Sequence, residues 1–253
     1  MIIDLNCDMG ELPAAIEDGT QESLLRWITS ANIACGGHAG DEQTMTATIE
    51  QALRAHVAIG AHPGYPDRAH FGRHAMDIPV AAVRDFVFEQ VKSLAVVAER
   101  HGATLTHVKP HGALYNQAVH NNGLAEAIAQ GVARWGRDVV LVGLAGSPML
   151  DVFRSAGFEV AAEAFADRRY ESDGTLRARS FRDALIEDPQ QAADQALRIA
   201  AGGSVQTVDG GEIAITARTI CIHGDTPSAA QIAAAVAQAL RAAGVELCAL
   251  RSG

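Results

Sequence analysis

The sequence has few cysteines, four in 253 residues, and no two of them are spaced as C-x-x-C. A disulfide framework or a structural zinc site built on cysteine pairs is therefore not expected. Cys7 and Cys35 stand among apolar residues, which predicts that they are small buried hydrophobes. Cys221 shares a strand face with His223 and Asp225, which favours a place in a pocket.

Basic residues are also scarce: 20 lysines and arginines stand against 30 aspartates and glutamates, a formal net charge of −10. A chain with this charge repels phosphate backbones and anionic lipid surfaces, so we expect no nucleic-acid partner and no membrane partner. Uninterrupted apolar runs fall short of the ~20 residues that a membrane helix needs. The segment Met1-Ile2-Ile3-Asp4 lacks the basic region of a signal peptide, so a cytoplasmic location is expected.

Two nucleotide-binding motifs are missing. No G-x-G-x-x-G follows the first expected strand and no G-x-x-x-x-G-K-[ST] is found, so neither a dinucleotide-binding fold nor a P-loop is predicted. The sequence also has no linker-like tract, low-complexity segment or clear internal repeat. We therefore expect one domain over residues 1–253.

What the sequence does contain is a repeated alternation of strand-like and helix-like segments. Strands are expected at 2–9, 31–35, 58–62, 105–109, 139–144, 159–164, 219–223 and 245–250. Helices are expected at 21–28, 41–56 with Asp41 as N-cap, 80–100, 124–135, 148–155, 189–200 and 228–242. Two short β segments flank a hairpin turn at Asp209-Gly210-Gly211. Repeated β-then-α units predict an α/β fold with a parallel sheet, and their number favours a barrel over an open doubly wound sheet.

Polar side chains repeat on one face of several expected strands. Alternation places Asp4, Asn6 and Asp8 on one face of the first strand. The same rule places His107, Lys109 and His111 together on another. Further polar residues at strand ends are Asn32, His38, His62, Cys221, His223 and Asp225. Because catalytic residues of barrel enzymes lie at the carboxyl ends of strands, and buried ionisable groups are costly unless they are paired or functional, this repetition predicts a shared site.

The residue types suggest roles within that site. Asp8 is the leading general base, because a carboxylate in a pocket can activate water. Lys109 could neutralise an oxyanion or a phosphoryl group, or act with a lowered pKa; the alternative is an ion pair with Asp8 or Asp4. The histidines His38, His62, His111 and His223 could transfer protons or bind a metal, although none stands in a local motif such as H-E-x-x-H.

Two arginine-bearing loops could hold a carboxylate or a phosphate. Arg68 and Arg73 stand in a glycine- and proline-rich segment, and Arg168 lies near the start of a second polar loop at 167–180. Solvated salt bridges are the alternative for the second loop, above all for Arg169 and Arg177. The segment 224–227 opens a helix with Pro227 in its first turn, which suits either an anion site or plain capping.

Seven blocks of sequence extend along nearly the whole chain in order. They are DLNCDMGE at 4–11, SANIACGGHAGD at 30–41, AIGAHPG at 58–64, HVKPHGALYN at 107–116, LVGLAGS at 141–147, FADR at 165–168 and CIHGDTP at 221–227. In these blocks the sequence resembles the LamB/YcsF family. It departs from the family at Leu12-Pro13-Ala14, where many members have a glycine–aromatic–glycine stretch, and at Gly37, which is often Phe.

The resemblance implies one subunit of a prokaryotic ATP-dependent 5-oxoprolinase, which opens the lactam of 5-oxoproline to L-glutamate. ATP, with Mg²⁺, and two partner subunits, B and C, are then expected. The implied fold is similar to the irregular (β/α) TIM-like barrel of glycoside hydrolases and polysaccharide deacetylases, with about seven strands. Asp8, Lys109 and His111 are the expected catalytic residues. The expected substrate-binding residues are Asn6, His38, His62, Arg68, Arg73, Arg168, His223 and Asp225.

Two other functions remain open from the sequence. One is a metal-dependent deacetylase or amidohydrolase that acts alone, with a divalent ion held by His38 or His62. The other is a non-catalytic subunit that only binds a carboxylate ligand for a partner. The oligomeric state is also open, and a homo-oligomer is compatible with the sequence.

Overall fold

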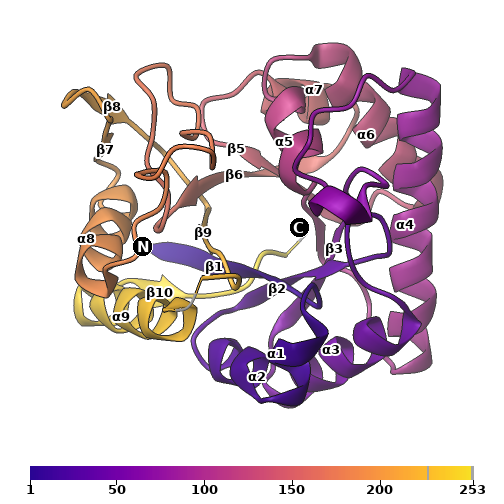
Figure 1. Cartoon of the computed structure of the whole chain (residues 1–253), viewed down its shortest axis with the longest axis horizontal. Coiled ribbons are helices and arrows are strands. Elements are labelled where there is room, and N and C mark those ends of the chain that lie inside the picture. Colours follow the sequence, from indigo (N-terminus) through magenta and orange to yellow (C-terminus); the bar gives the residue numbers. More distant parts are fainter. Residues whose placement is uncertain (227, 252–253) are drawn as a thin grey trace.

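Seven parallel strands close into a barrel in the computed structural model, which describes residues 1–226 and 228–251. The strands are β1 (Ile2–Met9), β2 (Ser30–Ala34), β3 (Ala58–His62), β4 (His107–Val108), β5 (Val140–Leu144), β6 (Glu159–Phe165) and β9 (Thr219–Ile222). Each strand pairs with the next in this order, and β1 pairs with β9 to complete the ring. The expected TIM-like α/β barrel with about seven strands is therefore confirmed (Figure 1).

Two smaller β pairings lie outside the ring. The short strand β10 (Glu246–Leu247) runs parallel to the start of β1, pairing with Ile2 and Ile3. Strands β7 (Ser204–Gln206) and β8 (Glu212–Ala214) form an antiparallel ribbon around the turn at Asp209, so the expected hairpin is confirmed.

Helices surround the barrel. They are α1 (Pro13–Glu17), α2 (Thr20–Leu25), α3 (Glu42–Arg54), α4 (Val80–Arg100), α5 (Gly112–Ala118), α6 (Asn122–Trp135), α7 (Met149–Ser155), α8 (Pro189–Ala200) and α9 (Ala229–Ala242), with a 3₁₀ turn at Arg68–His70. In Figure 1, α4 and α6 lie on one side of the strands, and α8 and α9 lie together on the opposite side. Helix α4 buries Val83, Val87, Val91 and Leu94, a spacing that places them on one helical face.

Helix α3 begins where the sequence predicts. Asp41 Oδ1 accepts a hydrogen bond from Thr44 N at 2.8 Å, and Thr44 Oγ1 accepts one from Asp41 N at 2.8 Å. This reciprocal capping box satisfies two backbone donors that a helix start leaves free. By contrast, the short helix α5 was not predicted, because it begins at Gly112, two residues after Pro110, and such residues usually mark a turn. The predicted helix opening at Pro227 lies outside the described residues.

Both faces of β1 are buried, as expected for a strand between a barrel interior and a helix layer. Leu5 and Cys7 belong to the main hydrophobic core, whereas Asp4, Asn6 and Asp8 face polar partners from other strands. Cys7 and Cys35 are buried apolar groups, as predicted. The alternation of β1 therefore separates a packing face from a polar interior face.

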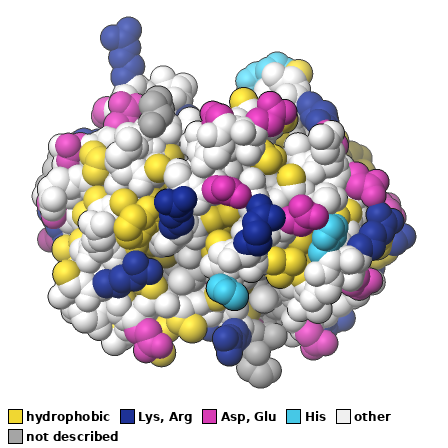
Figure 2. Space-filling model, turned by 90° about the horizontal axis from the view of Figure 1, so that it is seen from below, with side chains coloured by type: hydrophobic (Ala, Val, Ile, Leu, Met, Phe, Trp, Pro, Cys, Tyr) yellow, Lys and Arg dark blue, Asp and Glu magenta, His cyan; other side chains and the backbone are white. Residues whose placement is uncertain are grey.

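The outer surface carries mixed charges. On the face shown in Figure 2, lysine and arginine side chains are interspersed with acidic and apolar ones. Among the described residues, no helix combines the length and the apolar character needed to cross a membrane.

Candidate active site

The polar interior begins at Asp4, deep in the barrel. Its carboxylate accepts hydrogen bonds from Thr29 Oγ1 at 2.7 Å, Ser30 Oγ at 2.6 Å and Thr219 Oγ1 at 2.5 Å. Burial raises the pKa of Asp4, although these hydroxyl donors oppose the shift. Asp4 thus ties strands β1, β2 and β9 together and is fully engaged in structural contacts.

Closer to the carboxyl ends of the strands, hydrogen bonds between side chains join β1, β2 and β4. Asn32 Nδ2 donates to Asn6 Oδ1 at 2.7 Å and to Asp8 Oδ1 at 2.8 Å. The side-chain oxygen Oδ1 of Asn32 accepts a hydrogen bond from His107 Nε2 at 2.8 Å. Burial, and then the nearby positive charge of Lys109, lower the pKa of His107 to about 3. His107 is therefore a neutral structural histidine.

Lys109 lies at the centre of a group that we call the lysine network: Lys109, Asp8, Glu163, Asn6 and Cys221. Its Nζ is 2.9 Å from Asp8 Oδ1, 3.0 Å from Glu163 Oε1, 3.2 Å from Asn6 Oδ1 and 3.0 Å from Cys221 Sγ. Burial alone would lower the pKa of Lys109, but Asp8, Cys221 and Glu163 raise it well above its usual range. The possibility of a lowered pKa is therefore wrong, and the alternative of an ion pair with Asp8 is confirmed, with Glu163 as a second carboxylate partner.

Asp8 is the member of this network that lines the pocket. Burial would raise its pKa, but His62 and the ammonium of Lys109 hold the pKa well below the usual range. Asp8 therefore stays ionised at neutral pH. Its second oxygen, Oδ2, is 3.3 Å from His62 Nε2.

Glu163 was missed by the sequence reasoning. It stands in β6 opposite Thr219 of β9 and is fully buried. Alternation along β6 could have found it, because Glu163 shares a face with Ala161 and Phe165 and so points into the barrel.

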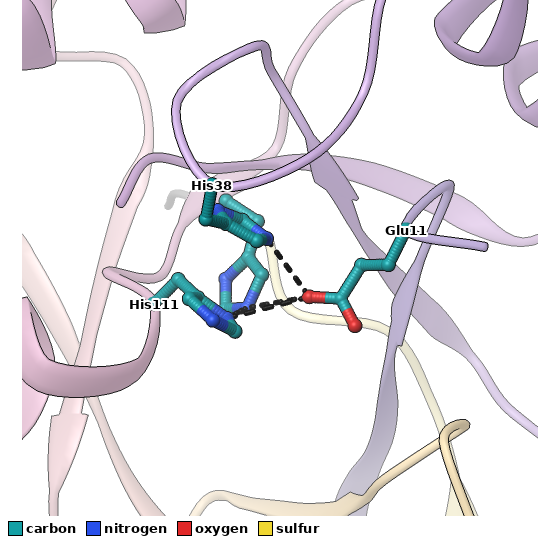
Figure 3. Close-up of side chains that lie close together, drawn as sticks. Glu11, His38 and His111 are labelled. Carbon is teal, nitrogen blue, oxygen red and sulfur yellow. Dashed lines mark hydrogen bonds and ion pairs between the residues drawn. The ribbon is translucent and has the colours of Figure 1, made fainter. Parts of the chain in front are cut away.

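A second group lies beside the first, and we call it the histidine cluster: Glu11, His38, His62 and His111. Glu11 Oε1 is 2.9 Å from His38 Nε2, 3.3 Å from His111 Nδ1 and 3.9 Å from His62 Nε2. The rings of His38 and His111 stack with centroids 3.6 Å apart (Figure 3). Burial lowers the pKa of His38, and burial together with His38 and His62 lowers the pKa of His111 well below its usual range.

These four residues come from four successive strand ends. Glu11 follows β1, His38 follows β2, His62 ends β3 and His111 follows β4. The sequence predicted that the three histidines would share a site. It missed Glu11, for which the available signal was a carboxylate two residues beyond a barrel strand.

A third group in the site is the pair of His223 and Asp167. Asp167 Oδ2 accepts a hydrogen bond from His223 N at 2.8 Å, and Asp167 Oδ1 lies 3.0 Å from His223 Nδ1. Burial would raise the pKa of Asp167, but His223 lowers it. A carboxylate that orients an imidazole in this way is typical of general acid–base sites. Asp167 was not among the predicted site residues, although it follows β6 directly.

Three arginine side chains, those of Arg73, Arg168 and Arg179, line the pocket. Arg73 and Arg179 both form ion pairs with Asp225. Burial would raise the pKa of Asp225, but Arg179, His223 and Arg73 lower it to about 2. Arg168 is buried; desolvation and the charge of Arg179 lower its pKa to about 10.

Arg68 does not reach the pocket lining, contrary to the prediction. Its guanidinium donates to the backbone carbonyls of Gly36 and Gly40 and so holds the loop after β2. The loop between β3 and α4 directs this side chain outward, which strand alternation could not reveal.

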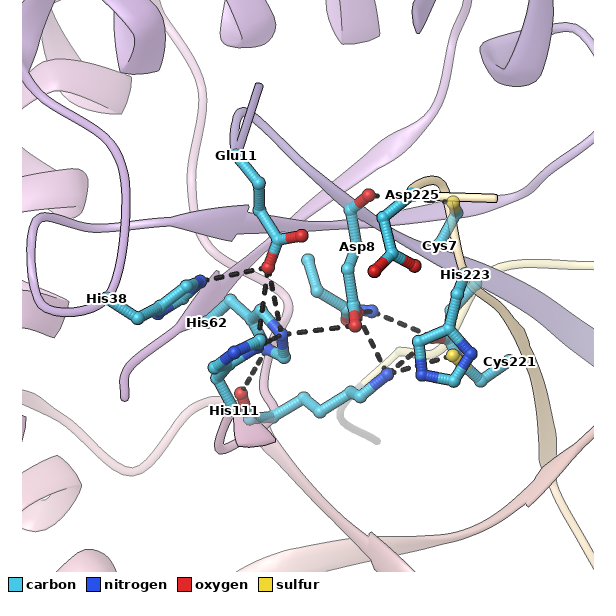
Figure 4. A network of polar contacts seen from close by, with 12 residues as sticks. Cys7, Asp8, Glu11, His38, His62, His111, Cys221, His223 and Asp225 are labelled. Atoms are coloured by element: carbon cyan, nitrogen blue, oxygen red, sulfur yellow. Dashed lines mark hydrogen bonds and ion pairs between the residues drawn. The ribbon is translucent and has the colours of Figure 1, made fainter. Parts of the chain in front are cut away.

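These groups surround a pocket of about 390 Å³, a size suited to a small metabolite (Figure 4). Its lining includes Asp8, Glu11, His62, Arg73, Lys109, His111, Phe165, Arg168, Arg179, His223 and Asp225. Asn6 and His38 do not line it; they contact Lys109 and Glu11 from within the protein. The structure thus brings together most of the predicted residues at one end of the barrel.

Gln90 of α4 fixes the segment that follows β3. Its Oε1 accepts from Gly64 N at 3.0 Å, and its Nε2 donates to Gly64 O at 2.8 Å. A Cβ atom at Gly37 would lie 2.4 Å from Gln90 Oε1 and 2.6 Å from Gly64 O. Glycine at position 37 is therefore required by this clamp.

The comparisons with known proteins match nearly the whole length of the chain. The model of the LamB/YcsF family matches residues 3–253. The A subunit of 5-oxoprolinase from Bordetella pertussis is 50% identical over 245 residues, which cover 97% of each chain. Its counterpart from Chloroflexus aggregans is 48% identical over 243 residues, 96% of each chain.

Solved structures give the same result. The lactam utilization protein of Thermus thermophilus superposes with a TM-score of 0.91 at 40% identity, covering 99% of this chain and 100% of that one. A putative cellobiose-phosphate cleavage protein of Enterococcus faecalis, with a TM-score of 0.57 and 12% identity, covers 98% of this chain and 96% of its own and shares the fold alone. The family expected from the sequence blocks is confirmed, and the chain belongs to the LamB/YcsF family.

Proposed function

We propose that this chain is the A subunit of an ATP-dependent 5-oxoprolinase and opens the lactam of 5-oxoproline to L-glutamate, together with partner subunits B and C. The observation that carries the proposal is full-length similarity to proteins of that name, in a chain whose pocket holds an ionised carboxylate between a lysine and several histidines. The pocket volume of about 390 Å³ suits a ligand of this size.

The need for ATP follows from the chemistry of the lactam. Its nitrogen donates electrons into the carbonyl, so water attacks poorly. Transfer of the γ-phosphoryl group of ATP to the amide oxygen gives ADP and a phosphorylated imidate. A first water adds at that carbon, the protonated ring nitrogen leaves as an amine, and an acyl phosphate remains. A second water hydrolyses the acyl phosphate to L-glutamate and phosphate, which balances the reaction.

Asp8 is suited to position the attacking water. Its carboxylate is held ionised and is oriented by Lys109 and Asn32, so it accepts a hydrogen bond from water without rearrangement. Lys109 acts by holding Asp8 and Glu163, because its ammonium already has four polar partners. It is therefore a positioning residue in this proposal.

The other side of the pocket is suited to the departing nitrogen and to negative charge. His223, oriented by Asp167, can deliver a proton to the ring nitrogen as it leaves. Arg73, Arg168 and Arg179 supply positive charge for a carboxylate or a phosphoryl group. The sequence has no P-loop, which supports a division of labour in which the partner subunits supply part of the phosphoryl-transfer machinery, with Mg²⁺ accompanying ATP.

The test is glutamate formation from 5-oxoproline and ATP, measured with this chain alone, with subunits B and C alone, and with all three. We expect activity only in the full mixture. Asp8→Asn should reduce kcat by at least about a hundredfold, in line with the loss of the carboxylate that positions the attacking water, whereas the surface variant Arg84→Gln should match the unaltered protein. Full activity without this chain, or with Asp8→Asn, would contradict the proposal. Lactam hydrolysis by this chain alone without ATP would instead indicate an independent amidohydrolase.

A further inference from the structure

The histidine cluster has the spacing of a metal-binding site. One donor atom from each of Glu11, His38, His62 and His111 lies within 4.8 Å of every other. Glu11 Oε1 lies 2.9 Å from His38 Nε2, 3.3 Å from His111 Nδ1 and 3.9 Å from His62 Nε2. His62 Nε2 lies 2.9 Å from His111 Nδ1. In a tetrahedral zinc site with bonds of about 2.0–2.1 Å, donor atoms lie about 3.3 Å apart. The observed spacings fall on both sides of that value.

The backbone fixes which nitrogens face the centre. His62 Nδ1 lies 2.7 Å from Lys109 O, and His111 Nε2 lies 2.9 Å from Phe71 O. Because a carbonyl oxygen only accepts, each of these nitrogens carries the hydrogen. In the neutral rings, His62 Nε2 and His111 Nδ1 then point lone pairs at each other across 2.9 Å. Such a contact becomes favourable when a metal cation binds both nitrogens or when one of the two rings takes up a proton.

The anchoring of both rings matches the known behaviour of metal-ligating histidines. Such histidines donate their second N–H to a carbonyl or a carboxylate, which orients the ring toward the ion. His38 presents Nε2 to Glu11 and would exchange its proton for the ion on binding.

Glu11 supplies the negative charge. Among the described residues its ion pairs are all with the three histidines, and its side chain is only 8% exposed. A buried carboxylate needs a cationic partner. In the neighbouring group Asp8–Cys221–His223, the Lys109 ammonium already lies 2.9 Å from Asp8 and 3.0 Å from Cys221. That group therefore has its own cation, unlike the histidine cluster.

We propose that Glu11, His38, His62 and His111 bind one divalent transition-metal ion of the zinc type. Three imidazole nitrogens and one carboxylate oxygen favour zinc, cobalt or nickel over Mg²⁺ and Ca²⁺, which prefer all-oxygen ligands. Because Glu11, His62 and His111 line the pocket and His62 lies 3.3 Å from Asp8, the ion lies in the pocket wall beside Asp8. The inference goes beyond the proposed function, since it requires neither ATP nor a lactam.

The experiment is calorimetric titration of the chelator-treated full chain with Zn²⁺ and with Co²⁺, and in parallel with Mg²⁺. We expect one tight equivalent of Zn²⁺ or Co²⁺, a visible Co²⁺ spectrum of the four-coordinate type, and no comparable binding of Mg²⁺. His62→Ala and His111→Ala should weaken binding by about a hundredfold or more, since loss of outer partners alone costs ~10–100-fold.

A matched control lies on the surface. Asp67, His70 and His74 form another histidine–carboxylate group, and both of its histidines are exposed. His70→Ala should leave the tight equivalent unchanged. Glu11→Gln, which keeps the side-chain shape, provides a cluster variant that is expected to fold even if a histidine variant does not; circular dichroism of the metal-free proteins checks this.

Three results would overturn the proposal. The first is that the unaltered chain binds no stoichiometric Zn²⁺ or Co²⁺, which would mean that only a proton is shared between His62 and His111. The second is unchanged binding by both Glu11→Gln and His111→Ala. The third is loss of the tight equivalent in His70→Ala, which would place the ion on the surface.

Discussion

The lysine network and the histidine cluster lie side by side at the same end of the barrel, yet they neutralise buried carboxylates in different ways (Figure 4). In the lysine network, the ammonium of Lys109 balances Asp8 and Glu163. In the histidine cluster, the ion pairs of Glu11 within residues 1–226 and 228–251 are all with imidazoles, whose charge depends on a proton or an ion from solution. The first region carries its own permanent cation, whereas the second responds to its surroundings.

Asp8 joins the two regions. One of its oxygens contacts Lys109 at 2.9 Å, and the other lies 3.3 Å from His62. A change of charge in the histidine cluster therefore acts directly on the carboxylate that we propose positions water. The comparison can be tested by removing charges from each region in turn.

Replacement of Lys109 should have the largest effect on the stability of the fold. Lys109→Met leaves Asp8 and Glu163 buried without their shared cation, and we expect the free energy of unfolding to fall by about 3–5 kcal/mol. Urea denaturation measures it. The double variant Lys109→Met/Glu163→Gln should recover part of the loss, because one uncompensated charge is removed. A decrease below about 1 kcal/mol would show that the network is not held by its ion pairs.

Removal of the Glu11 charge should lower the free energy of unfolding by less than replacement of Lys109 does. In chelator-treated protein, Glu11→Gln keeps the shape but replaces the charged acceptor of the hydrogen bond from His38 by a neutral one, so we expect a loss of about 2 kcal/mol. The same denaturation experiment without metal measures it, and Arg84→Gln serves as the surface control. A loss equal to that of Lys109→Met would remove the difference that we draw between the two regions.

Acidification should reveal the neutral histidine beneath the lysine network. Because the pKa of His107 is about 3 in the folded chain and about 6.5 when unfolded, the unfolded state binds the extra proton between these values. Stability is therefore lost as the pH falls from about 6.5 toward 3. His107 should contribute about 1.4 kcal/mol per pH unit well inside this window.

Denaturation at several pH values between about 6.5 and 4.5 measures this slope. The variant His107→Gln, whose amide can still donate to Asn32, should show a slope smaller by one proton. Identical slopes for both proteins would mean that His107 is not the group responsible.

The rim arginines should have the smallest effect on stability. Arg73 is about one-third exposed and Asp225 retains Arg179, so Arg73→Gln should cost at most about 0.5–1 kcal/mol of stability. In the three-subunit assay we expect KM for 5-oxoproline to rise by about tenfold, the loss of one charge-assisted contact, with little change in kcat. A fall in kcat with constant KM would contradict the binding role.

Much of the fold could be predicted from the sequence. Strands β1 and β3 and helices α4 and α8 have the bounds that periodicity predicted, because each carries a regular apolar pattern between clear turn signals. Helix α5 was missed because it begins at Gly112, close after Pro110, where the sequence indicates a turn.

Strand alternation predicted part of the site, and the arginine-bearing loops predicted Arg73 and Arg168. Asp8, His62, Lys109 and His223 lie on or next to strands, and they line the pocket. Glu11 and Arg68 lie on loops, and their side-chain directions depend on how those loops fold, which no strand pattern encodes. The catalytic roles assigned to Asp8, Lys109 and His111 stay predictions.

The clamp between Gln90 and Gly64 has a consequence for evolution within the family. A larger residue at position 37 cannot coexist with Gln90 in its present rotamer. Its Cβ atom would also lie 2.6 Å from the backbone oxygen of Gly64, so a change at Gln90 alone would not make room for it. A larger side chain at position 37 should therefore be accompanied both by another residue at position 90 and by a shifted backbone after β3.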